Sequence, residues 1–424
     1  LRWCHLPLHR DKFVTPQKLD TRLTDTPKLR RALNAPLLTL YGLGVTVGAG
    51  IYVLVGATAG QAGLFAPAAF VIAAIVVAFT AFSYAELSTR YPVSAGEAAY
   101  LEAGFSQNWL TVIVGLAVAA SGIISAAAVS IGAASYLHPL TGIATPILTI
   151  GVVAAMALVA VWGITQSVIV AGAITVIEVG GLAFVIYWGF GMADPSGVTV
   201  AQMIPPLTGP HWTGIGAGAL LAFFAFVGFE DMANVAEEVK DPTRTMPRAI
   251  IWTLVLATLI YVATMIAVLL AVPLDQLATS TAPLALVFEG ASPRIQQMFG
   301  MIAVVATING VLIQTIMASR VIYGLADRGH LPATIAKVSQ RTQTPVVATL
   351  VVAGIIMALT LTLSIEALAA RTSQVVLLIF ILVNLSLIRL KRRGPPIANY
   401  FRVPILVPYL GVATSVLLFA TSFL

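Results

Sequence analysis

Four glycines lie close together in one apolar stretch near the start of the chain. They are Gly42, Gly44, Gly48 and Gly50, within nine residues that also include Thr46. Each glycine destabilises a helix interior by about 1 kcal/mol relative to alanine, so this density predicts a break in a helix. The carbonyl groups before such a break can bind an ammonium group, and the N–H groups after it can bind a carboxylate.

Two other interpretations of these glycines are close packing of helices through small residues and a nucleotide-binding loop. Close packing explains part of the pattern, but not readily Gly48-Ala49-Gly50 together with Thr46. A nucleotide loop of this kind follows a strand, and no strand pattern precedes this stretch. The glycines therefore favour a broken helix that lines a cavity.

A second apolar stretch, residues 223–231, carries one glycine among aromatic residues and ends in two acids. A stripe of aromatic residues more often packs in a core or against lipid. The combination of Gly228 with Glu230 and Asp231 nevertheless favours a second break at this point. Two broken helices facing one cavity would offer carbonyl groups and N–H groups together, which suits a zwitterionic amino acid without identifying its side chain.

One acid lies in the middle of an apolar stretch, where it could bind and release a proton. This residue is Glu178, and Gly180 and Gly181 beside it leave room for a neighbouring helix. An ionisable side chain inside a membrane is costly and is by default a candidate functional residue. The alternative, which we weigh equally, is a structural acid that is permanently neutral or permanently paired.

The elements that must position these residues are membrane-spanning helices. Hydrophobic residues make up 59% of the 424 residues and charged residues only 9%, against about 25% charged in soluble domains. The apolar runs do not alternate, which excludes barrel strands, and each is long enough to cross a bilayer as a helix. Eleven spans are predicted, starting near Leu37, Pro67, Trp109, Thr145, Ser167, Ile215, Ala249, Gln296, Pro345, Thr372 and Pro404.

The basic residues predict the orientation, because lysine and arginine near span ends favour the cytoplasmic side. With the N-terminus inside, 21 of the 23 basic residues lie on the cytoplasmic side, and only Arg294 and Arg371 lie outside. We expect the plasma (inner) membrane, with residues 1–34 as a cytoplasmic tail because they lack the apolar region of a signal peptide. This distribution explains the net charge of +6 without a nucleic-acid partner.

Cysteine and histidine give no sign of a metal site or a disulfide. The single cysteine, Cys4, lies in the predicted cytoplasmic tail, so no disulfide-linked partner subunit is expected. The five histidines are scattered without ligand spacing, so no metal site is expected, and no cofactor is predicted.

Several other acids are interpreted as structural. Glu86 and Arg90 lie at a predicted cytoplasmic helix end, where ion pairs form gates or tie loops together, and we favour tying. Glu97 and Glu102 open the third span, where carboxylates suit a helix N-terminus.

Five pieces of the sequence, distributed over spans 1 to 10, form a recognisable set. They are Gly44-Val-Thr-Val-Gly-Ala-Gly-Ile51, Ser83-Tyr-Ala-Glu-Leu-Ser-Thr-Arg-Tyr-Pro92, Phe224-Ala-Phe-Val-Gly-Phe-Glu230, Glu237-Glu-Val-Lys-Asp-Pro242 with Pro247-Arg-Ala-Ile250, and Ala318-Ser-Arg-Val-Ile-Tyr-Gly-Leu-Ala-Asp-Arg-Gly-His-Leu-Pro332. In this order they resemble the amino acid, polyamine and organocation (APC) transporter superfamily, and within it bacterial relatives of cationic amino acid transporters.

The resemblance implies an all-α polytopic membrane protein with a five-plus-five inverted repeat of the leucine transporter type. Helices 1 and 6 would be broken around the substrate. The first repeat would span residues 35–192, the second 193–390, and a cytoplasmic loop with the eleventh span would follow at 391–424. Most members have twelve spans, whereas this sequence ends in or just after the eleventh, so either its last residue would lie outside or the sequence is truncated.

The resemblance also implies the site residues. Those around the first break would meet the substrate carboxylate, and those around the second would meet its ammonium group and gate the site. Members also use the middle of span 8, although the polar pair there could equally form interhelical hydrogen bonds. The predicted substrate-binding residues are Thr46, Val47, Gly48, Ala49, Gly50, Ile51, Phe224, Ala225, Phe226, Gly228, Thr307, Asn309 and Ser121.

Two departures from the family pattern bear on mechanism. Many proton-coupled relatives have a lysine where this chain has Glu178, which makes Glu178 the predicted coupling residue. Relatives that carry cationic substrates often have a glutamate in span 3, where this chain has Ser121. The site therefore has no obvious counter-charge for a second cationic group, and small neutral amino acids are favoured over arginine and lysine.

The resemblance and the residues together predict a secondary active amino acid transporter that works by alternating access, with proton-coupled uptake. The alternatives are an exchanger of amino acids or polyamines and, less favoured, a transporter-like amino acid sensor or a channel. A primary pump is disfavoured because the chain has no phosphate-binding Gly-x-x-x-x-Gly-Lys-Ser/Thr motif. No enzymatic activity is expected.

Overall fold

The protein is all-helical over the residues that the computed structural model describes, apart from one isolated bridge between Leu33 and Val239. These residues are 33–92, 96–162, 168–191, 197–342, 344–394 and 399–423, without the side chains of 49, 168–172, 234 and 237. The predicted tail lies outside them except for its last two residues. The helices are α1 (Ala35–Thr46), α2 (Ala49–Ala62), η1 (Gly63–Phe65), α3 (Ala66–Arg90), α4 (Gly96–Phe105), α5 (Asn108–Thr141), α6 (Thr145–Trp162), α7 (Val168–Gly191), η2 (Val200–Met203), α8 (His211–Phe226), η3 (Phe229–Glu238), α9 (Pro242–Ala271), α10 (Leu274–Thr279), α11 (Pro283–Leu286), α12 (Pro293–Asp327), α13 (Val346–Thr362), α14 (Ile365–Arg392), α15 (Leu406–Ala420) and η4 (Thr421–Phe423).

All eleven predicted spans correspond to helices, which confirms the fold class. Nine helical stretches in the described part of the chain are long and apolar enough to cross a membrane, and α1 and α13 are shorter apolar helices. One of the nine stretches, Gly50–Arg90, contains nearly all of α2 from the first predicted span and α3 from the second. The two helices are separated at Gly63, the C-cap residue of α2, which has a φ of 59°. The helix starts carry the expected signals: Asn34 accepts a hydrogen bond from the Leu37 N–H, and Ser364 accepts one from the Ala367 N–H. The division into two inverted repeats stays a prediction.

Both predicted helix breaks are present, and they touch each other. The first separates α1 from α2 at Val47 and Gly48, and the second separates α8 from η3 at Val227 and Gly228. Gly228 has a φ of 122°, which favours glycine, and a Cβ there would lie 2.6 Å from the Val45 carbonyl oxygen. The breaks therefore meet in the middle of the bundle.

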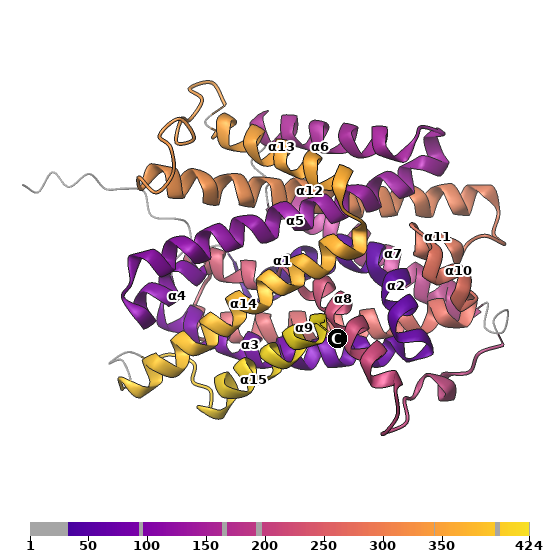
Figure 1. Cartoon of the computed structure of the whole chain (residues 1–424), viewed down its shortest axis with the longest axis horizontal. Coiled ribbons are helices and arrows are strands. Elements are labelled where there is room, and N and C mark those ends of the chain that lie inside the picture. Colours follow the sequence, from indigo (N-terminus) through magenta and orange to yellow (C-terminus); the bar gives the residue numbers. More distant parts are fainter. Residues whose placement is uncertain are drawn as a thin grey trace, which may run out of the picture.

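Several long helices, among them α3, α6 and α12, run along the long axis of the molecule, whereas α2 runs steeply across it (Figure 1). At one end, which we call the α4 end, lie α4 and the end of α14; α10 and α11 lie at the opposite end. The basic residues that close α3, α12 and α14, among them Arg90, Arg328 and Arg392, belong to the α4 end. Arg294 follows α11 at the start of α12, on the opposite side.

A buried ion-pair network ties the α4 end together. The Glu86 carboxylate, which is fully buried, lies 2.6 Å from both Arg90 Nη2 and Lys391 Nζ, and it accepts a hydrogen bond of 2.8 Å from the Val403 N–H. Lys391 also donates to the Val403 carbonyl. The network joins α3 and α14 to the segment before α15, which agrees with the interpretation of Glu86 as a tie.

Removing the charge of Glu86 is expected to destabilise the protein. In Glu86→Gln, two largely buried cations would face each other without their shared carboxylate, and breaking a buried pair in this way costs about 3–5 kcal/mol. The apparent melting temperature of detergent-purified protein should fall clearly. The exposed acid of α4 gives a control: Glu102→Gln should leave the melting temperature unchanged. An equal effect of the two substitutions would contradict the prediction.

Candidate functional site

A small cavity, with a volume of about 30 Å³, lies where the two helix breaks meet, and we call it the central cavity. Residues of α1, α2, α5, α8 and α12 enclose it, and none of these lining residues, all in the described part of the chain, carries a charge. The lining comprises Gly44, Val45, Thr46, Gly48, Gly50, Ser125, Val129, Phe224, Val227, Gly310, Ile313 and Gln314.

The N-terminus of α2 opens onto the central cavity. Gly48 is its N-cap residue and provides no side-chain hydrogen bond to the first turn, and both Gly48 and Gly50 line the cavity. The first N–H groups of a helix have no partner within the helix and carry a partial positive charge. An anionic group such as a carboxylate fits this place in the cavity.

The Thr46 hydroxyl offers a second polar contact. Its side chain is buried, it lines the central cavity, and its Oγ1 atom has no hydrogen-bond partner among the described residues. A buried hydroxyl without a partner costs about 1–3 kcal/mol, so a ligand that pairs with it regains free energy.

Tyr261 of α9 joins the two broken helices. Its hydroxyl lies 2.6 Å from the carbonyl oxygen of Thr46 and 2.7 Å from that of Ala225. The Phe224 carbonyl in turn accepts a hydrogen bond from the Val227 N–H. Protein donors therefore engage these three carbonyl groups at the helix ends, and the expectation that carbonyl groups there meet the substrate ammonium group stays a prediction.

The structure places the predicted substrate-binding residues in three groups. Thr46, Gly48, Gly50 and Phe224 line the central cavity. Gly228 and Ser121 line a second cavity instead. The remaining residues around the breaks are buried but do not line the central cavity: Val47, Ile51, Ala225 and Phe226. The side chain of Ala49 lies outside the described residues.

The predicted pair on α12 does not line the central cavity. The Thr307 hydroxyl is buried and donates to the Ala303 carbonyl of its own helix at 2.7 Å. The Asn309 side chain donates from Nδ2 to Glu178 Oε1 at 3.1 Å, which is an interhelical hydrogen bond. Of the two interpretations open for Asn309, the geometry supports the interhelical one.

Sequence reasoning missed the residues that do line the cavity from α5 and α12. Ser125 follows Ser121 by one helical turn, and Gln314 follows Gly310 by one turn. The available signal was this spacing of four residues, which puts each pair on one face of its helix.

Glu178 belongs to α7 and contacts Tyr52 of α2 and Asn309 of α12. Its side chain is fully buried, and its Oε2 atom has no hydrogen-bond partner among the described residues. The Tyr52 hydroxyl donates to the Glu178 backbone carbonyl at 2.6 Å, and a Cβ on Gly181 would lie 2.5 Å from that hydroxyl. Gly181 thus allows the expected close approach of the first broken helix, whereas Gly180 faces open space.

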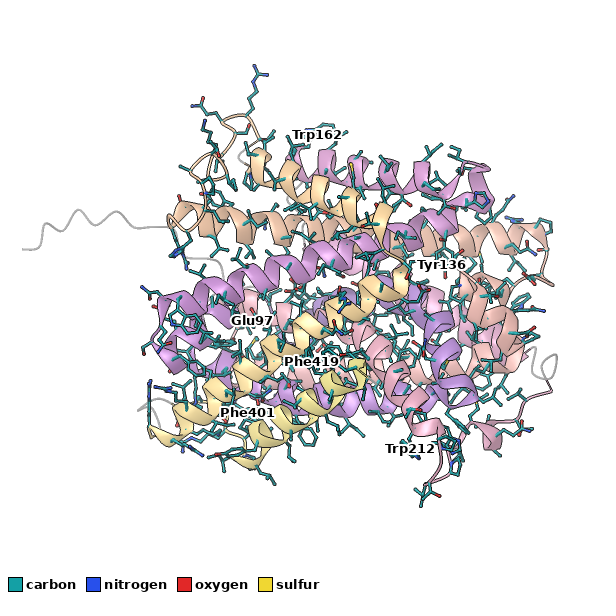
Figure 2. The ribbon with its side chains drawn as sticks, in the orientation of Figure 1. Glu97, Tyr136, Trp162, Trp212, Phe401 and Phe419 are labelled. Carbon is teal, nitrogen blue, oxygen red and sulfur yellow. The ribbon has the colours of Figure 1, made fainter. Side chains whose placement is uncertain are left out.

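The second cavity is also small, with a volume of about 20 Å³, and acids line it. Glu97 lines it together with Glu230 and Asp231. Glu97 lies in the first turn of a helix, α4, as a carboxylate that suits a helix N-terminus should, and it also lines this cavity, which we did not expect. Tyr84 donates a hydrogen bond to Glu97 at 3.0 Å, and burial raises the pKa of the Glu97 carboxyl. Figure 2 shows Glu97 toward the α4 end and Trp212 toward the other end. The complete lining is Glu97, Val118, Ser121, Val227, Gly228, Glu230, Asp231, Gln314, Met317, Val376, Ile379 and Phe380.

Interrupted helices around a small cavity inside an apolar helical bundle define a membrane transporter. The chain belongs to the amino acid permease family, whose family model matches residues 36–424, and it is an amino acid transporter of the APC superfamily. It is similar to a branched-chain amino acid permease of Bacillus subtilis, with 26% identity over 92% of this chain and 87% of the relative.

Two further similarities show the range of the family and its fold. A vacuolar cationic amino acid transporter 2 of Arabidopsis thaliana is 31% identical over 87% of this chain, which spans only 61% of that relative. A mutant manganese transporter of Eremococcus coleocola has a similar structure, with a TM-score of 0.64 over 94% of this chain and 90% of that chain. At 15% identity this likeness shows the fold alone, and the described residues of our chain contain no cluster of three or more histidines, cysteines or acids that could hold a metal.

Proposed function

We propose that this protein takes up a small neutral amino acid by proton-coupled alternating access. It would lie in the plasma (inner) membrane with its N-terminus in the cytoplasm. The observation that carries the proposal is the uncapped N-terminus of α2, which faces a small cavity with an uncharged lining. The substrate carboxylate would meet the first N–H groups of α2 and the Thr46 hydroxyl.

The lining of the central cavity supports a neutral substrate. Val129, Phe224 and Ile313 offer apolar contacts, and Ser125 and Gln314 are its polar side chains from α5 and α12. A guanidinium or a second ammonium group would lose water without gaining a counter-charge, which is costly.

Glu178 supports the proton-coupled form of transport. Its carboxyl group is buried next to the first helix break and has one oxygen with a donor, from Asn309, and one without a described partner. Protonation of Oε2 would make the buried Glu178 carboxyl group neutral and so remove the cost of a buried negative charge. A carboxyl group in this position can therefore carry a proton while the cavity opens to either side.

Neutral amino acids are expected to stabilise the purified protein, and cationic ones are not. A ligand at about 100 times its dissociation constant adds about 2.7 kcal/mol of stability, which thermal-shift measurements detect. Alanine, serine, valine and leucine should be compared with arginine, lysine, agmatine and putrescine. Tight binding of arginine or lysine, with no response to the neutral set, would contradict the proposal and direct attention to Glu230 and Asp231.

The two serines of α5 provide a matched control for selectivity. Ser125→Asp puts a carboxylate into the central cavity, whereas Ser121→Asp puts one into the second cavity, one turn away. Only Ser125→Asp should shift binding toward arginine and lysine. An equal shift in the two variants would show that the substrate does not sit in the central cavity.

A further inference from the structure

The two cavities follow one another along the molecule. On α5, Ser125 lines the central cavity and Ser121 the second. On α12, Ile313 lines only the central cavity and Met317 only the second. Because α5 begins and α12 ends at the α4 end (Figure 1), both helices place the second cavity about one turn, or roughly 5.4 Å, nearer to that end.

Of the residues that the structure describes, only two line both cavities, and they come from different elements. Val227 is the first residue after α8, and its extended backbone (φ −63°, ψ 130°) places it at the second break. Gln314 is on α12, and both side chains are half-buried. The two cavities therefore adjoin each other at this pair.

Gly122 of α5 leaves space for the Gln314 side chain. A Cβ on Gly122 would lie 3.2 Å from Gln314 Oε1 and 2.6 Å from Met317 Cε. Gln314 has several rotatable bonds, and Val227 adjoins Gly228, whose positive φ marks a special backbone conformation. A rotation of the Gln314 side chain, or a change of backbone conformation at Gly228, could therefore separate the side chains of Gln314 and Val227.

We propose that Val227 and Gln314 form the barrier between the central cavity and the α4 end, and that the second cavity is the passage by which substrate reaches or leaves that end. The proposal rests on the proposed function for the identity of the solute. The position of the barrier rests on the two cavities alone.

The single cysteine of the chain makes a direct accessibility test possible. In a Cys4→Ser background, Ser125→Cys reports on the central cavity and Ser121→Cys on the second. Each is labelled with a water-soluble methanethiosulfonate reagent in detergent-purified protein. Gln314→Ala, and separately Val227→Ala, should increase the labelling rate of Ser125→Cys several-fold and leave that of Ser121→Cys unchanged.

The neighbours of Gln314 on α12 are matched controls. Ile313→Ala enlarges only the central cavity and Met317→Ala only the second, so neither should reproduce the effect. Only variants that keep the melting temperature and the size-exclusion profile of their background are compared. Unchanged labelling in both barrier variants, or the same increase in Ile313→Ala, would overturn the proposal.

A substrate arm distinguishes failure of the barrier from failure of the proposed function. Saturating alanine or leucine should slow the labelling of Ser125→Cys more than that of Ser121→Cys. If neither amino acid protects but the barrier variants still increase labelling, the barrier stands and the proposed substrate class fails. If protection occurs without an effect of the barrier variants, the substrate site stands and the barrier is overturned.

Discussion

Gly50→Leu is expected to abolish amino acid uptake while the protein stays inserted in the membrane. A Cβ on Gly50 would lie 2.8 Å from the Ala225 Cα atom and 3.3 Å from Phe224 Cδ1, so a leucine must displace the end of α8. It would also fill the part of the central cavity next to the first N–H groups of α2. Uptake of labelled substrate into proteoliposomes measures the effect.

A glycine of α6 gives the matched control for this substitution. Nothing lies within 4 Å of a Cβ on Gly151, which is exposed on its helix, so Gly151→Leu should transport at the wild-type rate. Membrane insertion and the melting temperature of both variants are measured together with uptake. Wild-type uptake by an inserted Gly50→Leu variant would show that the site at the first break is misplaced.

Glu178→Gln is expected to remove accumulation driven by a pH gradient while substrate exchange survives. The glutamine amide oxygen can still accept the hydrogen bond from Asn309, so the packing between α7 and α12 is retained. What is lost is the ability to bind and release a proton at this position. Both activities are measured in proteoliposomes, one with an imposed pH gradient and the other with labelled substrate on one side.

Exchange and accumulation together separate coupling from a structural role. A structural acid predicts that both activities fall together, because the same transport cycle would be damaged. Glu366→Gln, on an exposed acid of α14, should change neither. Proton-driven accumulation that is unchanged in Glu178→Gln would contradict the coupling proposal.

The fold could be predicted because membrane helices leave a strong signal. Apolar runs of bilayer length located every span, and the glycine density at residues 42–50 and Gly228 located both breaks. The span boundaries shifted: α9 begins at Pro242 rather than near Ala249, and α14 begins at Ile365 rather than near Thr372.

The cavity lining could be predicted only in part, for a physical reason. A helix that packs against protein on one side and lipid on the other is apolar all round, so its sequence does not show how it is rotated. The family resemblance therefore supplied Ser121 on α5 and Asn309 on α12, whereas the structure places Ser125 and Gln314 of these helices at the central cavity. Tyr261 was missed because its partners are backbone carbonyl groups, which no side-chain pattern reveals.

The shared hydroxyl of Tyr261 has a mechanical consequence for the transport cycle. One phenolic proton serves two carbonyl groups, so separating α1 from α8 would leave at least one buried acceptor unpaired, at a cost of about 1–3 kcal/mol. The ends of α1 and α8 are therefore coupled to each other and to α9 through this one side chain, so a movement of either helix end alone carries that cost.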